Sequence, residues 1–274
     1  HLLGAEVYGA SLDIPTQPSH FQSAEIKKYI KDCRIDLRDT KKIYKLVAEI
    51  NPDFVFHLAA QSLVRRSFTN PLETFQTNIF GTLNLLEALR PLKKTCIAVL
   101  ITSDKCYENV EWVWGYRETD TLGGSDPYSA SKSAAELVIR SHVKSFFPKG
   151  GFIRVAVGRA GNVIGGGDWA QDRLVPDCIR SWTKGKTAIL RNPNATRPWQ
   201  HVLEPLSGYL TLAVSLHQNP ELHGEPFNFG PPAVKSQSVK ELVKEMSNHW
   251  PDVKWKNDSM PENNPSESGL LKLN

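Results

Sequence analysis

Short runs of β-branched and apolar residues alternate along the chain with longer stretches in which apolar positions recur every three or four residues. The short runs predict strands over residues 6–12, 33–37, 53–60, 95–103 and 151–165. The periodic stretches predict amphipathic helices over residues 40–52, 71–92 and 126–147. The order of elements is therefore strand, helix, strand, repeated along the chain.

This alternation favours an α/β fold with a doubly wound parallel sheet. Helices cover both faces of such a sheet, so its strands are continuously apolar, as residues 96–101 (CIAVLI) are. After Gly165 the sequence becomes rich in Gly, Pro, Asn and Trp, which predicts a smaller mixed α/β lobe. We expect a sheet domain over residues 1–164 and the lobe over residues 165–274, with about residues 199–230 partly returning to the sheet.

Charge and cysteine usage narrow the class of partner. The chain has 33 Lys and Arg against 29 Asp and Glu, scattered along its length, for a net charge of +4. Nucleic-acid binding needs a basic stripe, so it is not predicted, whereas a small anionic ligand suits the slight excess of positive charge.

The four cysteines lie far apart, which argues against a zinc site or disulfide framework and favours a cytoplasmic setting. No metal site is predicted, because the candidate histidines are interpreted as packed or capping residues, namely His57 and His201. No apolar run approaches the roughly 20 residues of a membrane span, so no membrane association is predicted.

Ligands of open α/β sheets bind outside the carboxyl ends of the strands. The strand over residues 53–60 ends in small residues that allow a flat cofactor to approach the backbone. The next strand ends in Ser103, Asp104 and Lys105, a polar cluster that a core strand does not need. The alternative is a helix N-cap formed by Ser103 or Asp104 beside a solvated lysine.

Tyr128 and Lys132 lie one helical turn apart at the start of an apolar helical pattern. An ammonium about 5–6 Å from the phenol is expected to lower the pKa of the tyrosine from about 10 toward neutrality. Such a tyrosine can remove a hydroxyl proton. The alternative is two polar residues on the exposed face of a helix, because this spacing recurs by chance.

The strand over residues 151–165 ends in an Ala-Gly-Asn step and three consecutive glycines. Glycine permits a ligand to approach backbone amides closely. Asn162 can reach a diphosphate or a sugar hydroxyl, and the guanidinium groups of Arg173 and Arg197 suit bidentate binding of phosphate. The alternative is a glycine turn with surface arginines.

With these residues in order, the chain resembles the extended short-chain dehydrogenase/reductase family, and within it the nucleotide-sugar 4,6-dehydratases. The motifs that carry the resemblance are HLAAQ (57–61), TNIFGT (77–82), Ser-Asp-Lys (103–105), Tyr-x-x-x-Lys (128–132) and RAGNVIG (159–165). The runs TSDKCY (102–107) and EWVWGYRE (111–118) are similar to those of dehydratases that act on CDP-glucose.

The resemblance implies a Rossmann domain that binds NAD and a lyase that acts on a nucleotide-diphospho-hexose, CDP-glucose. The implied reaction oxidises C4, eliminates water across C5 and C6, and reduces C6. The residues implied in catalysis are Ser103, Asp104, Lys105, Tyr128 and Lys132. Those implied in binding NAD are Asp36, Leu37, Leu58, Ala59, Ala60, Asn78, Tyr128, Lys132 and Ala160. Those implied in binding the substrate are Asn162, Arg173 and Arg197.

The implied roles divide between the two motifs. Tyr128 takes the C4 hydroxyl proton with help from Lys132 and Ser103. Asp104 is the general acid for the departing C6 hydroxyl, so burial must raise its pKa. Lys105 stands where most dehydratases have a glutamate base, and it acts either as a neutral base at C5 or as an electrostatic stabiliser of the enolate.

Other implications concern cofactor affinity, assembly and rival activities. Family members open with a glycine-rich turn that holds the pyrophosphate on a helix N-terminus. The present sequence starts after that position, so we expect weaker binding of NAD.

The resemblance implies a homodimer or a dimer of dimers, formed through the helices that start near Pro71 and Pro127. The rival interpretations are a nucleotide-sugar 4-epimerase, a 4,6-dehydratase of another substrate, and a catalytically silent homologue.

Overall fold

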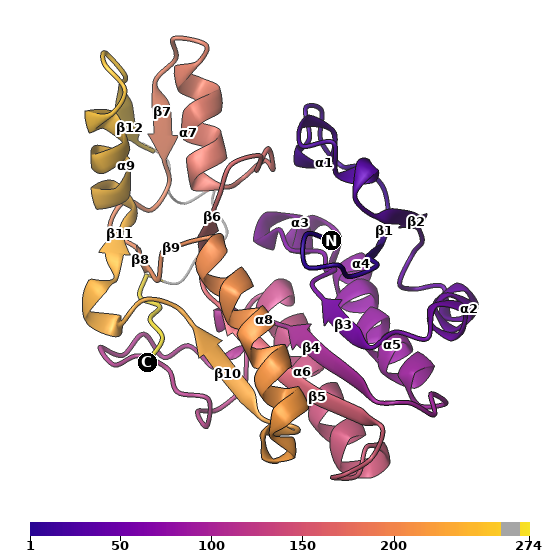
Figure 1. The fold of residues 1–274 in the computed structure, drawn as a ribbon. Helices are drawn as coiled ribbons and strands as arrows, with labels where there is room; N and C mark the ends of the chain where they lie inside the picture. Colours follow the sequence, from indigo (N-terminus) through magenta and orange to yellow (C-terminus); the bar gives the residue numbers. More distant parts are fainter. Residues whose placement is uncertain (259–268) are drawn as a thin grey trace.

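Four parallel strands form the central sheet, in the order β10-β5-β4-β3 (Figure 1). They are β3 (Phe54–His57), β4 (Cys96–Ile101), β5 (Ile153–Ala160) and β10 (Pro226–Phe229). The computed structural model of the chain describes residues 1–258 and 269–274. All but the last residue of β4 are buried, as its unbroken apolar run predicts for a strand covered on both faces.

Helices cover both faces of this sheet, which confirms the doubly wound fold. On one face lie α2 (Thr40–Ile50), α5 (Gly81–Leu89) and α6 (Pro127–Phe146), whose apolar side chains pack with Leu100 and Val155. On the other face, α8 (Leu203–Gln218) packs against β4 and β5. The second core contains Ile97, Val99, Ala156, Tyr209, Leu212, Ala213 and Leu216.

The two N-terminal strands form a separate sheet. β1 (Tyr8–Ser11) and β2 (Lys31–Arg34) pair in parallel with each other, with α1 (His20–Ser23) and η1 (Ile26–Lys28) between them. No described strand pairs with the free edge of β3, so the predicted single sheet is divided in two. Neither N-terminal strand has a fully buried residue, so the pair has no buried apolar face that packs against the central sheet.

The predicted helix over residues 71–92 is divided by a wider turn. α3 (Val64–Thr69) precedes α4 (Pro71–Phe75), and a π-helical segment, η2 (Gln76–Phe80), then leads into α5. Such π-turns often occur at functional sites. Here the turn buries Asn78, and Gly81 follows it where an added Cβ would lie 3.1 Å from Leu37.

Beyond the central sheet and the β1–β2 pair, the short strands of the described residues form three two-stranded sheets. β6 (Val163–Ile164) pairs with β9 (Gln200–His201), β7 (Ala188–Leu190) with β12 (Trp255–Asn257), and β8 (Thr196–Arg197) with β11 (Gln237–Ser238). Helices α7 (Leu174–Trp182) and α9 (Val239–Asn248) share a core with β7. The remaining short helices are η3 (Asp104–Cys106), η4 (Pro220–Leu222) and η5 (Ala233–Lys235).

The described C-terminal residues return to the segment that follows β4. Leu271 and Leu273 are buried in a cluster with Tyr107 and Tyr116. Residues 259–268 of the predicted lobe lie outside the described residues. Within the described ranges, no helix is long and apolar enough to cross a membrane.

Candidate active site

The Ser-Asp-Lys triplet forms a tight turn directly after β4. Ser103 caps η3: its hydroxyl accepts a hydrogen bond from the Lys105 amide (3.2 Å) and donates one to Asp104 Oδ1 (3.0 Å). The capping interpretation is thus confirmed, yet it does not account for Asp104. Its second carboxyl oxygen, Oδ2, is buried without a described hydrogen-bond partner.

Burial controls the charge of Asp104. The residue is 2% exposed, and burial raises the pKa of its carboxyl above 3.8. The charge of Lys105, the hydrogen bond from Ser103 and the charge of Arg197 act in the opposite direction. The environment therefore favours the protonated acid, as a proton donor requires.

Tyr128 and Lys132 lie on the buried side of α6, which rules out the exposed-face alternative. The helix begins with Pro127 at its first position, and the Asp126 carboxylate accepts a hydrogen bond from the Ser129 amide (2.9 Å). The Tyr128 amide donates to Ser67 Oγ (3.2 Å), which fixes the helix start against α3. Tyr128 is 7% exposed and Lys132 6%.

The predicted lowering of the Tyr128 pKa by Lys132 is wrong for this chain. Burial raises the pKa of the phenol to about 12, although a hydrogen bond with Ser103 and the charge of Arg173 lower it. Lys132 is itself buried, and burial lowers the pKa of its ammonium to about 8 against the raising influence of Cys106 and Glu136. Burial dominates because both side chains lost most of their hydration.

Most of the residues predicted to bind a cofactor lie at the carboxyl ends of parallel strands, whereas Asn78, Tyr128 and Lys132 lie on helices. Leu58 is exposed, and Ala59 and Ala60 are half-buried, directly after β3. Asp36 follows β2 and is held by Arg38, Leu37 packs against the core, and Ala160 ends β5.

Asn78 lies in η2, and its side-chain amide is used within the fold. Its Oδ1 accepts from the Gln61 amide (2.8 Å), and its Nδ2 donates to Gln61 O (3.0 Å) and Ser131 Oγ (2.9 Å). Both donors are used, so Asn78 holds the loop after β3 against α6 and does not present its amide group to a ligand.

The residues predicted to bind the substrate come from the segments beyond β5. Asn162 is half-buried between β5 and β6, and its carbonyl accepts from the Gln200 amide (2.9 Å). Arg173 precedes α7, donates to Ser62 Oγ (3.2 Å) and acts electrostatically on Tyr128. Arg197 is buried and acts electrostatically on Asp104. Arg173 therefore lies near Tyr128, and Arg197 lies near the Ser-Asp-Lys triplet.

A cavity of about 450 Å³ lies beside this cluster. Lys105, Gly124, Asp126 and Ser129 are among its lining residues, whereas Asp104 and Tyr128 are not. The cavity therefore adjoins the triplet through Lys105 alone and does not contain the buried acid.

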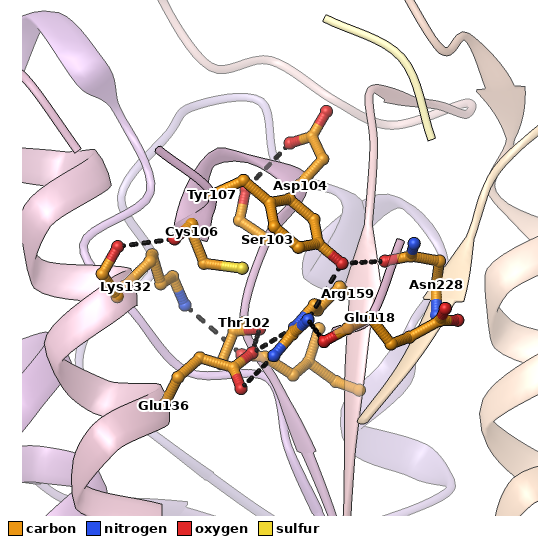
Figure 2. A network of polar contacts seen from close by, with 12 residues as sticks. Thr102, Ser103, Asp104, Cys106, Tyr107, Glu118, Lys132, Glu136, Arg159 and Asn228 are labelled. Atoms are coloured by element: carbon orange, nitrogen blue, oxygen red, sulfur yellow. Dashed lines mark hydrogen bonds and ion pairs between the residues drawn. The ribbon is translucent and has the colours of Figure 1, made fainter. Parts of the chain in front are cut away.

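Sequence reasoning missed two charged residues beneath the site, Glu136 of α6 and Arg159 of β5. They form a buried ion pair (2.8 Å between Nε and Oε1) behind the triplet (Figure 2). One signal was present: an arginine within the apolar run of residues 153–160 needs a buried partner.

Comparison with known proteins decides the family. Residues 5–265 match the family described as GDP-mannose 4,6 dehydratase. The chain belongs to this family. The chain is 47% identical over 276 residues to the CDP-glucose 4,6-dehydratase of Salmonella typhimurium, covering 99% of this chain and 76% of that protein.

Solved structures at lower identity show the same fold. DesIV, a dTDP-glucose 4,6-dehydratase from Streptomyces venezuelae with NAD bound, has a TM-score of 0.78 at 20% identity, covering 99% of this chain and 80% of that chain. UDP-glucuronic acid 4-epimerase from Bacillus cereus has a TM-score of 0.79 at 20% identity, covering 97% and 82%. The fold is thus shared by dehydratases and epimerases, so side chains must decide between the two activities.

Proposed function

We propose that this chain is a lyase that dehydrates a nucleotide-diphospho-hexose, CDP-glucose, to the 4-keto-6-deoxy sugar with NAD as cofactor. The observation that carries the proposal is the buried Asp104, whose surroundings favour the protonated acid, beside Ser103 and the buried Tyr128. An epimerase of the same fold has no water to remove and so does not need this acid. The 47% identity to a CDP-glucose 4,6-dehydratase supports the choice of substrate.

The first half of the reaction uses Tyr128, Lys132 and Ser103. Tyr128 takes the proton of the C4 hydroxyl as C4 becomes a ketone, and the Ser103 hydroxyl binds the same oxygen. Lys132 stabilises the phenolate that this transfer requires. The ketone acidifies the C5 hydrogen, so oxidation has to precede elimination.

The second half uses Asp104 and Lys105. Asp104 gives its proton to the C6 hydroxyl, which leaves as water while the C5 hydrogen is removed. Lys105 stands on the same turn and either accepts the C5 proton or, when water takes that proton, stabilises the enolate charge. If Lys105→Ala exchanges the C5 hydrogen for solvent deuterium at the wild-type rate, the base role is wrong.

The donor set at the end of β4 fits a nicotinamide ribose. A lysine ammonium has three N–H donors, and Nζ of Lys132 has one acceptor among the described residues, Ile101 O at 3.3 Å. The remaining donors suit ribose hydroxyls, and the exposed Leu58 with Ala59 and Ala60 leaves an apolar edge for a flat ring. When bound there, NAD would supply the hydride acceptor for the oxidation of C4 and the hydride donor for the reduction of C6, and its positive charge would favour the Tyr128 phenolate.

The substrate diphosphate is assigned to Asn162, Arg173 and Arg197. Two guanidinium groups suit the two phosphates of a nucleoside diphosphate. In this arrangement residues 1–164 bind NAD and residues 165–274 bind the nucleotide sugar. The cysteines Cys33, Cys96, Cys106 and Cys178 are free, which suits a reducing, cytoplasmic setting.

A homodimer is proposed from the surface of α4, η2 and α6. These helices lie side by side and expose Leu72, Phe80 and Leu137, which are 69%, 53% and 47% exposed. Covering them with the same surface of a second chain would remove a continuous apolar area from water.

Mass spectrometry of the reaction tests the proposed function. The purified chain is incubated with NAD and CDP-glucose, and the nucleotide sugar is weighed. Loss of one water supports the dehydratase, and a product of unchanged mass that chromatography separates from CDP-glucose identifies an epimerase. Unchanged substrate under saturating NAD would contradict both activities.

A further inference from the structure

Glu136 and Arg159 form a bidentate ion pair beneath the triplet turn. Arg159 Nε donates to Glu136 Oε1 (2.8 Å) and Nη2 donates to Oε2 (2.9 Å). The side chains are 5% and 3% exposed. Burying each of the two charges costs several kcal/mol. Apolar residues of similar volume in the place of a buried ion pair therefore often give a protein that is at least as stable. Stability alone therefore does not account for this buried pair.

Other hydrogen bonds of the pair go to the two residues that flank the triplet turn, and Arg159 Nη1 also donates to Glu118 O (2.9 Å) (Figure 2). Thr102 Oγ1 donates to Glu136 Oε1 (2.5 Å), and Arg159 Nη1 donates to Tyr107 Oη (2.9 Å). Thr102 immediately precedes Ser103, and Tyr107 immediately follows η3. Both ends of the turn are therefore attached to one rigid, planar unit.

The pair also connects the turn to the helix that carries Tyr128 and Lys132. Glu136 lies one helical turn after Lys132 on α6. The groups that act electrostatically with the Lys132 ammonium are Cys106 of η3, His57 of β3 and Glu136. Burial raises the pKa of the Cys106 thiol and lowers that of His57 to about 3, so both are neutral at pH 7. Glu136 is therefore the charged member of this set.

We propose that Glu136 and Arg159 are positioning residues that hold the Ser103-Asp104-Lys105 turn in register with Tyr128 and Lys132. The pair touches none of the reacting atoms. It acts because a displacement of about 1 Å in either half of the site is enough to lower the rate about a hundredfold. This inference rests on the proposed dehydratase function.

Tyr107→Phe and Tyr116→Phe form a matched pair of variants. The two rings are stacked with centroids 5.1 Å apart and both are buried. The Tyr107 hydroxyl accepts from Arg159 and donates to Asn228 Oδ1 (2.6 Å), whereas the Tyr116 hydroxyl bonds Asn109 and the Val110 amide. We expect Tyr107→Phe to lower kcat for water loss about 10- to 100-fold at nearly unchanged KM. For Tyr116→Phe we expect kcat to stay within about twofold of wild type, because the lost hydrogen bonds affect only the stability of the fold.

Hydrogen exchange gives a readout that does not depend on activity. The amides of Thr102 and Cys106 are hydrogen-bonded to Gly158 O (2.9 Å) and Ser103 O (3.1 Å). We expect Tyr107→Phe and Thr102→Val to speed exchange in residues 102–107, and Tyr116→Phe to leave it unchanged. Equal exchange in all these variants would overturn the proposal. A wild-type chain without dehydratase activity contradicts the proposed function instead, and exchange still decides the positioning role.

The pH profile separates positioning from general loss of stability. Glu136→Gln removes a negative charge near Lys132 and leaves the Arg159 cation uncompensated, so the pKa of Lys132 falls further. We expect the alkaline fall of kcat/KM to move about one unit toward lower pH. A merely structural role would reduce kcat/KM equally at every pH. If Glu136→Gln fails to fold, the profile of Thr102→Val decides: a profile and kcat like those of wild type would refute the proposal.

Discussion

Asp104→Asn removes one proton donor and one buried carboxyl group while keeping the shape of the side chain. In the wild-type chain Oδ1 accepts from Ser103 Oγ at 3.0 Å, and Oδ2 is buried without a described partner. An unpartnered buried polar group costs about 1–3 kcal/mol, and more if charged. Asparagine can keep the Ser103 bond through its own Oδ1, and its second polar atom carries no charge at any pH.

The direction of the stability change depends on pH. The folded-state pKa of Asp104 is raised above 3.8, so the unfolded chain ionises this group first as the pH rises. Wild-type stability therefore declines above pH 3.8 until the folded-state pKa is passed, and the asparagine variant avoids this decline. At pH 7 we expect the variant to be more stable by at least about 1–2 kcal/mol, a rise in Tm of at least about 2–6 °C. Near pH 4 the two proteins should have equal stability.

The same substitution is expected to lower the rate of water loss about 10²- to 10⁴-fold, the usual contribution of a general acid. In deuterium oxide, the recovered substrate should still gain deuterium at C5, because oxidation and C5 deprotonation do not use Asp104. Asp53→Asn is the matched control, since its side chain is 75% exposed in an ion pair with Lys94. Wild-type turnover together with unchanged stability at pH 7 would refute the role of Asp104 as a buried acid.

Three further predictions follow from burial and exposure. Burial lowers the pKa of Lys132 to about 8, so kcat/KM should fall as the pH rises through that value, and a flat profile up to pH 10 would contradict this role. Burial lowers the pKa of His57 from 6.5 to about 3, so its contribution to stability is present above pH 6.5 and is lost as the pH falls toward 3. Urea unfolding should show this decline to be shallower in His57→Gln. Phe80→Glu with Leu137→Glu places charges in the proposed dimer surface, and sedimentation should show monomers. A dimer that persists in this double variant would exclude α6 and η2 as its interface.

The residues that sequence reasoning identified are those whose signal is local. Ser103, Asp104 and Lys105 are adjacent, and Tyr128 and Lys132 are one helical turn apart, so a short window reveals each group. The strand-end rule then brings the two groups to one edge of the sheet. The alternation of elements likewise predicted β3, β4 and β5 and the helices of one face, whereas β10 and α8 come from the segment that was expected only to return partly to the sheet.

The residues that were missed or misjudged depend on contacts between distant segments. The bond from Arg159 to Glu136 spans 23 residues, and that from Tyr107 to Asn228 spans 121. The amide of Asn78 is used by the loop after β3, a contact that no spacing in the sequence reveals. The predicted lowering of the Tyr128 pKa was wrong because the spacing to Lys132 does not reveal how deeply the phenol is buried, and burial raises its pKa.

By itself, the sequence determined the type of fold, the position of the active groups at the strand ends and the residue types available for proton transfer. The spacing of apolar residues and the polar residues that follow each strand indicate these properties, and both signals lie within a few neighbouring positions. Only the tertiary structure decided which groups are charged and which are held in place. Desolvation and ion pairing depend on the atoms that surround a side chain, and folding brings those atoms together from all parts of the chain.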